Sequence, residues 1–254
     1  MGLLSLTVLG QEEPARDALP ERLPPRTATA RKATDRITID GKLDEASWKS
    51  ADRLPIDMRH ARGRTIEPAG YARVTWDNAS FYVALEVLDK DIRAQGDGHD
   101  DAAISPPNDV AEVFIDINND PEHMFEFHLN AVNGFNDFFI IRPRQGSPLL
   151  ARARFGLVFF KEWNLKRYAA AVQVQGTVNK SEDVDQGWTG EIQLPFASLL
   201  MPLDQERPGT NDVWRVQMVI QDAGTTGHYV NWSPDYEPWY HHGIDQWGRV
   251  KFAE

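Results

Sequence analysis

The residues of this sequence best suited to bind a ligand are polar side chains that alternate with apolar ones. The polar positions are Glu112 and Asp116 in residues 109–117; Glu126, His128 and Asn130 in 124–132; Thr189, Glu191 and Gln193 in 187–194; and Arg215, Gln217 and Gln221 in 212–222. A period of two places the polar groups of each strand on one face. Carboxylates, amides and a guanidinium pair well with the vicinal hydroxyls of an uncharged ligand. If these strands are neighbours, the pattern predicts a hydroxyl-binding face; the alternative is an ordinary solvated face.

A second candidate is the aromatic segment 228–247, which mixes Trp and Tyr with Pro, Asp, His and Gly. It is too irregular to form a strand beyond Trp232. We expect Trp232 and Trp247 to be buried in the core. Rings on a loop are harder to bury, and a flat ring stacks on the apolar face of a pyranose. We therefore predict ligand contact for Trp239 and Tyr240.

An acidic loop follows residues 109–117. Its oxygen-bearing side chains stand at alternate positions, as in calcium-binding loops: Asp116, Asn118, Asp120 and Glu122. The loop lacks the glycine and the distal glutamate of an EF-hand. We predict a calcium site here, and an Asx-rich turn is the alternative.

The sequence supports catalysis less well than ligand binding. Glu112 and Glu191 are the pair considered for glycoside hydrolysis, which requires two carboxyl groups across one bond. A transition-metal site at His99 or at His241–His242 is disfavoured, because seven histidines are spread along the chain with no helical His-x₃-His pair. The sequence contains no GxSxG, Walker or GxGxxG motif, so acyl transfer and nucleotide binding lack support.

Composition restricts the class of protein. The 254 residues carry a net charge of −11, which argues against nucleic-acid binding. The hydrophobic fraction of 41% is enough for a sizeable core. Cysteine is absent, so disulfides and thiolate sites are excluded. No apolar run reaches the roughly 20 residues of a membrane span.

The chain divides into three regions. Residues 1–10 (MGLLSLTVLG) form a short apolar block that we interpret as the remnant of a secretion signal. Residues 11–34 are rich in Pro, Arg and Glu and are predicted to be a linker. Residues 35–254 are predicted to form one domain. Export would place the protein outside the cell, in a periplasm or on a cell surface.

The domain is expected to be all-β, an antiparallel sandwich of the immunoglobulin-like or jelly-roll-like type. Strands are predicted at 71–77, 80–88, 109–117, 124–132, 135–141, 154–160, 167–178, 187–194, 212–222, 226–232 and 247–252. One short helix is expected over 44–51 with Asp44 as its N-cap, and a second near 195–200.

Several segments, taken in order, resemble the family 9 carbohydrate-binding modules and the wider DOMON-like superfamily. They are IDGKLDEASW (39–48), VTWDNASFYVALEVLDKDI (74–92), NDVAEVFID (108–116), FEFHLN (125–130), GWTGEIQLPFASL (187–199), VWRVQMVIQDA (213–223) and WGRVKF (247–252). This resemblance implies a secreted, non-catalytic protein that binds a sugar, acts in carbohydrate catabolism beside a glycoside hydrolase, and holds structural calcium.

By position, the resemblance assigns ligand contact to Glu112, His128 and Asn130, with Trp239 as one stacking ring. Together with the strand pattern, the predicted ligand-binding residues are Trp239, Tyr240, Glu112, His128, Asn130, Arg215 and Gln221. Ser105-Pro106-Pro107 stands where the family has its other stacking Trp, and His128 stands where an Arg is expected.

Two other functions stay open within this resemblance. Some superfamily members bind haem, and Met124 with His128 is the candidate pair of axial ligands. The chain is otherwise either an accessory domain of a glycoside hydrolase or a hydrolase itself.

Overall fold

The computed structural model describes residues 22–60, 64–96, 98, 108–223, 228–236 and 241–254. Its strands are β1 (Thr27–Lys32), β2 (Leu54–Arg59), β3 (Arg64–Trp76), β4 (Ser80–Val87), β5 (Val110–Asp116), β6 (His123–Asn130), β7 (Phe135–Ile141), β8 (Val158–Phe160), β9 (Ala169–Gln175), β10 (Gly187–Pro195), β11 (Val213–Asp222), β12 (His228–Asn231) and β13 (Gly248–Ala253). The short helices are α1 (Ala46–Ser50) and α2 (Phe196–Leu199), with 3₁₀ turns η1 (Pro148–Arg152), η2 (Met201–Leu203) and η3 (Ile244–Gln246).

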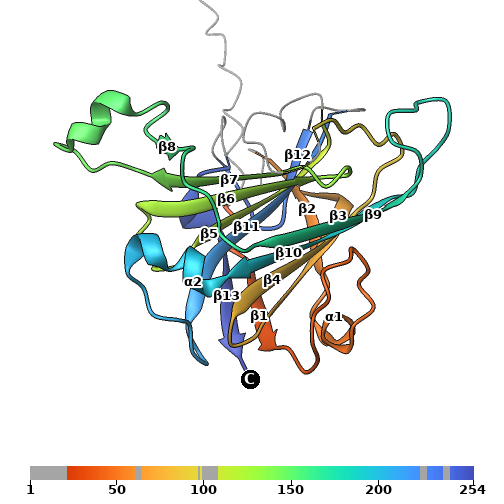
Figure 1. Ribbon diagram of the computed structural model, residues 1–254. Coiled ribbons are helices and arrows are strands. Elements are labelled where there is room, and N and C mark those ends of the chain that lie inside the picture. The colour runs from red at the N-terminus through yellow and green to blue at the C-terminus, as the bar shows by residue number, and fades with distance from the viewer. Residues whose placement is uncertain (1–21, 61–63, 97, 99–107, 224–227, 237–240) are drawn as a thin grey trace, which may run out of the picture.

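These strands form two layers that enclose one core, which confirms the predicted β-sandwich. The hydrogen-bonded order is β8-β7-β6-β5-β11-β12-β2-β3-β4-β10-β9, and Figure 1 shows β5, β6 and β7 in one layer and β4, β9 and β10 in the other. The apolar set of each strand lies in a shared core cluster. The layers approach closely at Gly190, where an added Cβ would lie 2.7 Å from Leu129 Cδ2. We call these layer 1 (β5–β8 and β11) and layer 2 (β2–β4, β9 and β10).

Most predicted strands agree with the structure within a few residues, because alternation is the dominant signal in half-buried antiparallel strands. The hairpin between β3 and β4 is also confirmed. Asp77 Oδ1 accepts hydrogen bonds from the backbone N–H groups of Ala79, at 2.7 Å, and Ser80, at 2.8 Å. Trp232 is buried in the sandwich core as expected, at 1% exposure, whereas Trp247, at 0% exposure, is buried in a different cluster.

Two local predictions are wrong. Residues 27–32, placed in the 11–34 linker, form β1, which pairs in parallel with β13 and β3. Helix α1 starts at Ala46. Its first backbone N–H groups donate hydrogen bonds to the carboxylate of Asp35, and not to Asp44 as predicted. Both errors involve long-range contacts that local pattern does not report. The predicted signal remnant lies outside the described residues, as does the linker up to residue 21.

The outer face of layer 1 carries its own apolar cluster. Phe114, Val219 and Met124 on the sheet pack with Ile244 and Trp247 from the segment after β12. Trp247 is therefore buried outside the sandwich core, in this second cluster. The C-terminal segment lies on layer 1 because these apolar side chains leave water there. In the part of the chain that the structure describes, no helix has the length and hydrophobicity that crossing a bilayer requires.

The outer face of layer 2 has one fully buried carboxylate, Glu191. Its oxygens accept hydrogen bonds from the backbone N–H of Asp40 (3.0 Å) and of Gly41 (2.8 Å), and from Trp48 Nε1 (2.7 Å). Glu191 thereby holds the 38–48 loop against β10. The polar pattern of β10 is structural at this position.

We predict that Glu191→Ala lowers the free energy of unfolding by about 3 kcal/mol or more, because two buried donors and one part-buried donor lose their acceptor at about 1–3 kcal/mol each. Urea denaturation measures this. The control is Gln193→Ala, on the same strand face, which loses a 2.9 Å hydrogen bond to Ser80 and should cost at most about 1.5 kcal/mol. Equal losses in the two variants would contradict the assigned role of Glu191.

Candidate functional site

Four predicted ligand residues lie together at one end of layer 1. Glu112 on β5 and His128 on β6 are directly opposite in register. One row further, Gln221 on β11 faces Val110, which in turn faces Asn130. The side chains share the outer face because their positions alternate with the core residues.

Arg215 lies away from this group, at the other end of β11. Six residues separate it from Gln221, a distance of roughly 20 Å along a strand. Its Nε is 3.7 Å from Asp116 Oδ2, and its NH2 donates to the Asn119 backbone oxygen at 3.4 Å. The structure thus separates Arg215 from the other predicted ligand residues and pairs it with the acidic loop.

Asn130 is fully buried and uses its amide to hold two loops. Its Nδ2 donates to the Gln95 backbone oxygen at 2.9 Å, and its Oδ1 accepts from the Val132 and Gly134 N–H groups at 3.1 and 2.7 Å. These bonds give Asn130 a positioning role at the end of β6.

A carboxylate–imidazole cluster lies next to Glu112. Glu126 accepts hydrogen bonds from Nε2 of His128, at 2.6 Å, and from Nε2 of His242, at 2.9 Å. An ionised carboxylate has only acceptors, so both rings donate here. His242 comes from the C-terminal segment, so Glu126 joins that segment to β6.

The cluster separates the protonation states of its acids. Burial would raise the pKa of Glu126, but the hydrogen bonds from His128 and His242 outweigh it and hold that pKa below its usual value. Burial raises the pKa of Glu112 to about 7, and the charge of Glu126 adds to this. Burial and the charges of both carboxylates raise the pKa of Tyr229 to about 12. Near neutral pH the face therefore offers an ionised Glu126, a neutral Tyr229 hydroxyl and a Glu112 carboxyl that gains or loses its proton easily.

His128 and the nearby histidines differ in their charge tendency. Burial lowers the pKa of His128, but the hydrogen bond to Glu126 and the charges of both carboxylates raise it overall. Burial lowers the pKa of His60. Burial, and then the charges of His60 and His242, lower the pKa of His241 well below its usual value. No pattern in the sequence indicates that these histidines are neighbours, since His60, His128 and His241 are far apart in the chain.

The two predicted stacking rings, Trp239 and Tyr240, lie outside the described residues. The neighbouring His241 is described, and its ring centroid is 4.4 Å from that of Tyr229 on β12. Stacking by Trp239 and Tyr240 stays a prediction.

The side chains of the acidic loop serve the loop itself. Asp116 Oδ1 accepts from the Asn118 and Asn119 N–H groups, at 3.1 and 2.7 Å. Asp120 accepts from the Glu122 and His123 N–H groups, both at 2.9 Å, and Glu122 pairs with Arg144. These contacts are those of an Asx-rich turn. Calcium binding by this loop stays a prediction.

The residues considered for catalysis and haem binding are arranged unfavourably. Glu112 and Glu191 lie on the outer faces of opposite layers, with the core between them, so they cannot flank one glycosidic bond. Met124 is fully buried in the second apolar cluster, and His128 Nε2 is engaged by Glu126. This pair therefore does not present two free axial ligands.

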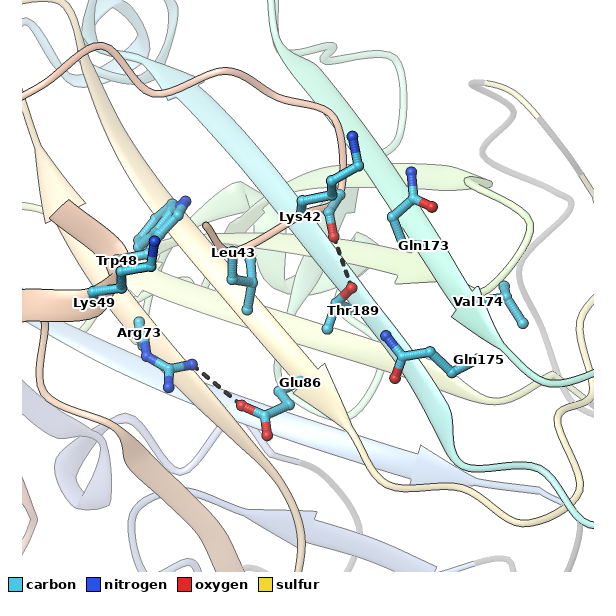
Figure 2. A pocket seen from close by; sticks show the side chains of 11 residues that line it. Lys42, Leu43, Trp48, Lys49, Arg73, Glu86, Gln173, Val174, Gln175 and Thr189 are labelled. Carbon is cyan, nitrogen blue, oxygen red and sulfur yellow. Dashed lines mark hydrogen bonds and ion pairs between the residues drawn. The ribbon is translucent and has the colours of Figure 1, made fainter. Parts of the chain in front are cut away.

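A separate groove of about 540 Å³ runs over the outer face of layer 2 (Figure 2). Two pairs of its polar groups are hydrogen-bonded to each other: Arg73 with Glu86 at 3.2 Å, and the Thr189 hydroxyl with the Gly41 backbone oxygen at 2.7 Å. Trp48, the aromatic residue among those lining it, is fully buried. The groove offers hydroxyl-binding groups but no exposed ring, which makes it the second candidate surface.

Comparisons with known proteins agree with the resemblance. Residues 39–139 match the family model described as carbohydrate family 9 binding domain-like. This part of the chain is similar to the family 9 carbohydrate-binding domains. No curated protein matches the chain in sequence.

Solved structures with a similar fold include a family 9 carbohydrate-binding module from Caldicellulosiruptor kristjanssonii. Its complex with cellotriose is 15% identical, with a TM-score of 0.58 over 90% of this chain and 94% of that one. Its complex with glucose is 15% identical, with a TM-score of 0.56 over 89% and 95%. A proposed carbohydrate-binding protein from Bacteroides uniformis is 12% identical, with a TM-score of 0.61 over 89% and 99%. At these identities the likeness shows the fold alone, a β-sandwich.

Two buried acids lie at the same end of the sandwich, Asp89 after β4 and Asp109 before β5. Asp109 accepts from the Arg93 N–H at 2.5 Å and the Ala223 N–H at 2.7 Å, which holds the ends of β5 and β11. Burial, and then the charge of Asp89, raise the pKa of Asp109 to about 7; burial raises that of Asp89.

The folded state therefore binds protons here that the unfolded state has released, between about pH 4 and pH 7. This contribution to stability is present at low pH and is lost as the pH rises through about 7. We predict that Asp89→Asn, whose amide can donate to Asp109, flattens this decline and is the more stable form at pH 8 by about 1 kcal/mol.

Urea denaturation at pH 5 and pH 8 in EDTA measures the effect, with the exposed Asp44→Asn as control. If the free energies of unfolding of Asp89→Asn and the wild type differ by the same amount at both pH values, the raised pKa of Asp109 is contradicted.

Proposed function

We propose that this protein is a non-catalytic carbohydrate-binding protein whose site is the outer face of layer 1. The observation that carries this proposal is the convergence of Glu112, His128 and Gln221 from three neighbouring strands. The family-model match and the fold shared with modules solved with cellotriose and glucose support it.

The chemistry of the face suits an uncharged sugar. A carboxyl near its pKa, an amide and a neutral tyrosine hydroxyl each donate and accept, as vicinal hydroxyls do. Each net hydrogen bond contributes about 1 kcal/mol, and a stacked ring about as much. A few such contacts give affinities between roughly micromolar and millimolar.

We propose Trp239 and Tyr240 as the stacking rings. They precede His241, and the described part of the same segment is attached to layer 1 through His242 and Trp247. We further propose export from the cytoplasm, structural calcium at residues 116–122, and action beside a glycoside hydrolase in carbohydrate catabolism.

Isothermal titration calorimetry with cellotriose and glucose tests the site. We expect wild-type binding to weaken roughly 5- to 30-fold in Trp239→Ala and in Glu112→Leu, equivalent to about 1–2 kcal/mol for one lost stacking or polar contact. Gln175→Ala, in the groove on layer 2, is the matched control and should bind as the wild type does.

Circular dichroism establishes that each variant is folded before titration. If Gln175→Ala loses affinity while Trp239→Ala and Glu112→Leu keep it, the sugar binds in the groove of Figure 2 and the proposed site is wrong.

A further inference from the structure

His60, Asp235 and His241 converge from three separate segments beside β12. His60 follows β2, Asp235 follows β12, and His241 precedes η3. Asp235 Oδ2 lies 3.6 Å from His60 Nδ1 and 3.9 Å from His241 Nδ1, and the three ligand atoms all lie within 4.8 Å of one another. Among the described residues, this is the one group of three His, Asp or Glu side chains whose ligand atoms lie this close together.

The distances are too long for hydrogen bonds, whose donor and acceptor atoms lie about 2.7–3.2 Å apart. They are close to the separations between ligand atoms around tetrahedral zinc, roughly 3.3–3.6 Å for metal–ligand bonds of about 2.0–2.2 Å. The two histidine nitrogens, which lie within 4.8 Å of each other, would move closer together around a bound ion.

The two Nδ1 atoms of the histidines are buried polar atoms whose hydrogen bonds are not satisfied by the described residues. His60 Nδ1 and His241 Nδ1 are buried, and within the described part of the chain neither makes a hydrogen bond. The exposed fractions of the side chains are 14% for His60, 7% for His241 and 0% for Asp235. A cation between them would bind both lone pairs and balance the buried carboxylate.

The supporting contacts fix these residues in place. The His60 backbone N–H donates to the Tyr229 backbone oxygen at 3.2 Å. The His241 backbone oxygen accepts from Trp247 Nε1 at 2.7 Å. Asn231 Nδ2 lies 3.5 Å from Asp235 Oδ2, in the position of an outer-shell group. The arrangement is therefore preorganised.

We propose that His60, Asp235 and His241 form a binding site for a divalent first-row transition metal, with Zn²⁺ as the representative ion. Two imidazole nitrogens and one carboxylate suit zinc and its neighbours, whereas calcium and magnesium take oxygen ligands. The three ligands leave a fourth position for water. The site is distinct from the predicted calcium loop at 116–122 and does not rest on the carbohydrate proposal. It also revises the sequence argument, because the fold joins histidines that are far apart in the chain.

Metal binding is tested on EDTA-stripped, dialysed full-length protein. Calorimetry with Zn²⁺ should give one site per chain, and Co²⁺ should give the visible absorption of a four-coordinate complex. Excess Ca²⁺ should leave the Co²⁺ spectrum unchanged. In His241→Ala and Asp235→Asn we expect the Zn²⁺ affinity to fall roughly tenfold or more.

The matched control is His123→Ala, whose ring contacts Asp120 on the acidic loop. It should bind Zn²⁺ with the affinity of the wild type. Zn²⁺ should raise the Tm of this variant as much as it raises the Tm of the wild type. Asp235→Asn keeps the shape of the side chain, so its loss of binding cannot be attributed to a cavity. The proposal is overturned if the wild type binds no stoichiometric Zn²⁺, if both ligand variants bind as the wild type does, or if Ca²⁺ displaces Co²⁺.

Discussion

The outer face of layer 1 depends on the hydrogen bonds that the buried Glu126 carboxylate accepts from His128 and His242. A charge in this position must be compensated, and the imidazoles of His128 and His242 provide the compensation. Because His242 belongs to the C-terminal segment, the same contact holds that segment against β6 and lets Phe114 pack on Trp247. It also places His241 beside His60, at a ring-centroid distance of 4.2 Å.

The two outer faces of the sandwich use similar polar residues for different purposes. On layer 2, Glu191 and Thr189 hydrogen-bond the 38–48 loop, so these side chains are structural. On layer 1, burial holds the Glu112 pKa near 7 beside an ionised Glu126, which leaves groups that can donate to and accept from hydroxyls. This difference in protonation supports the proposal of ligand binding at layer 1, which rests on the convergence of Glu112, His128 and Gln221.

Alternation in the sequence predicted the strands, their apolar faces and the sandwich, because each strand of this fold has one face in the core. It also placed Glu112 and His128 on the polar faces of their strands, but alternation does not show whether the two strands are neighbours. Register and long-range contacts determine the rest, and a single sequence does not report them. Arg215 has the same parity as Gln221 but lies at the opposite end of β11. Asp35 replaces Asp44 at the start of α1. The β12–β2 pairing brings His60 and Asp235 together, and the Glu126–His242 contact places His241 beside them.

Amide chemical-shift mapping with cellotriose locates the bound sugar on the folded protein most directly. Binding at layer 1 predicts that the largest ¹H–¹⁵N shifts fall on β5 around Glu112, on β6 around His128 and at the end of β11 around Gln221. Shifts confined to Arg73, Gln173 and Gln175 around the groove on layer 2, with layer 1 unchanged, would contradict it.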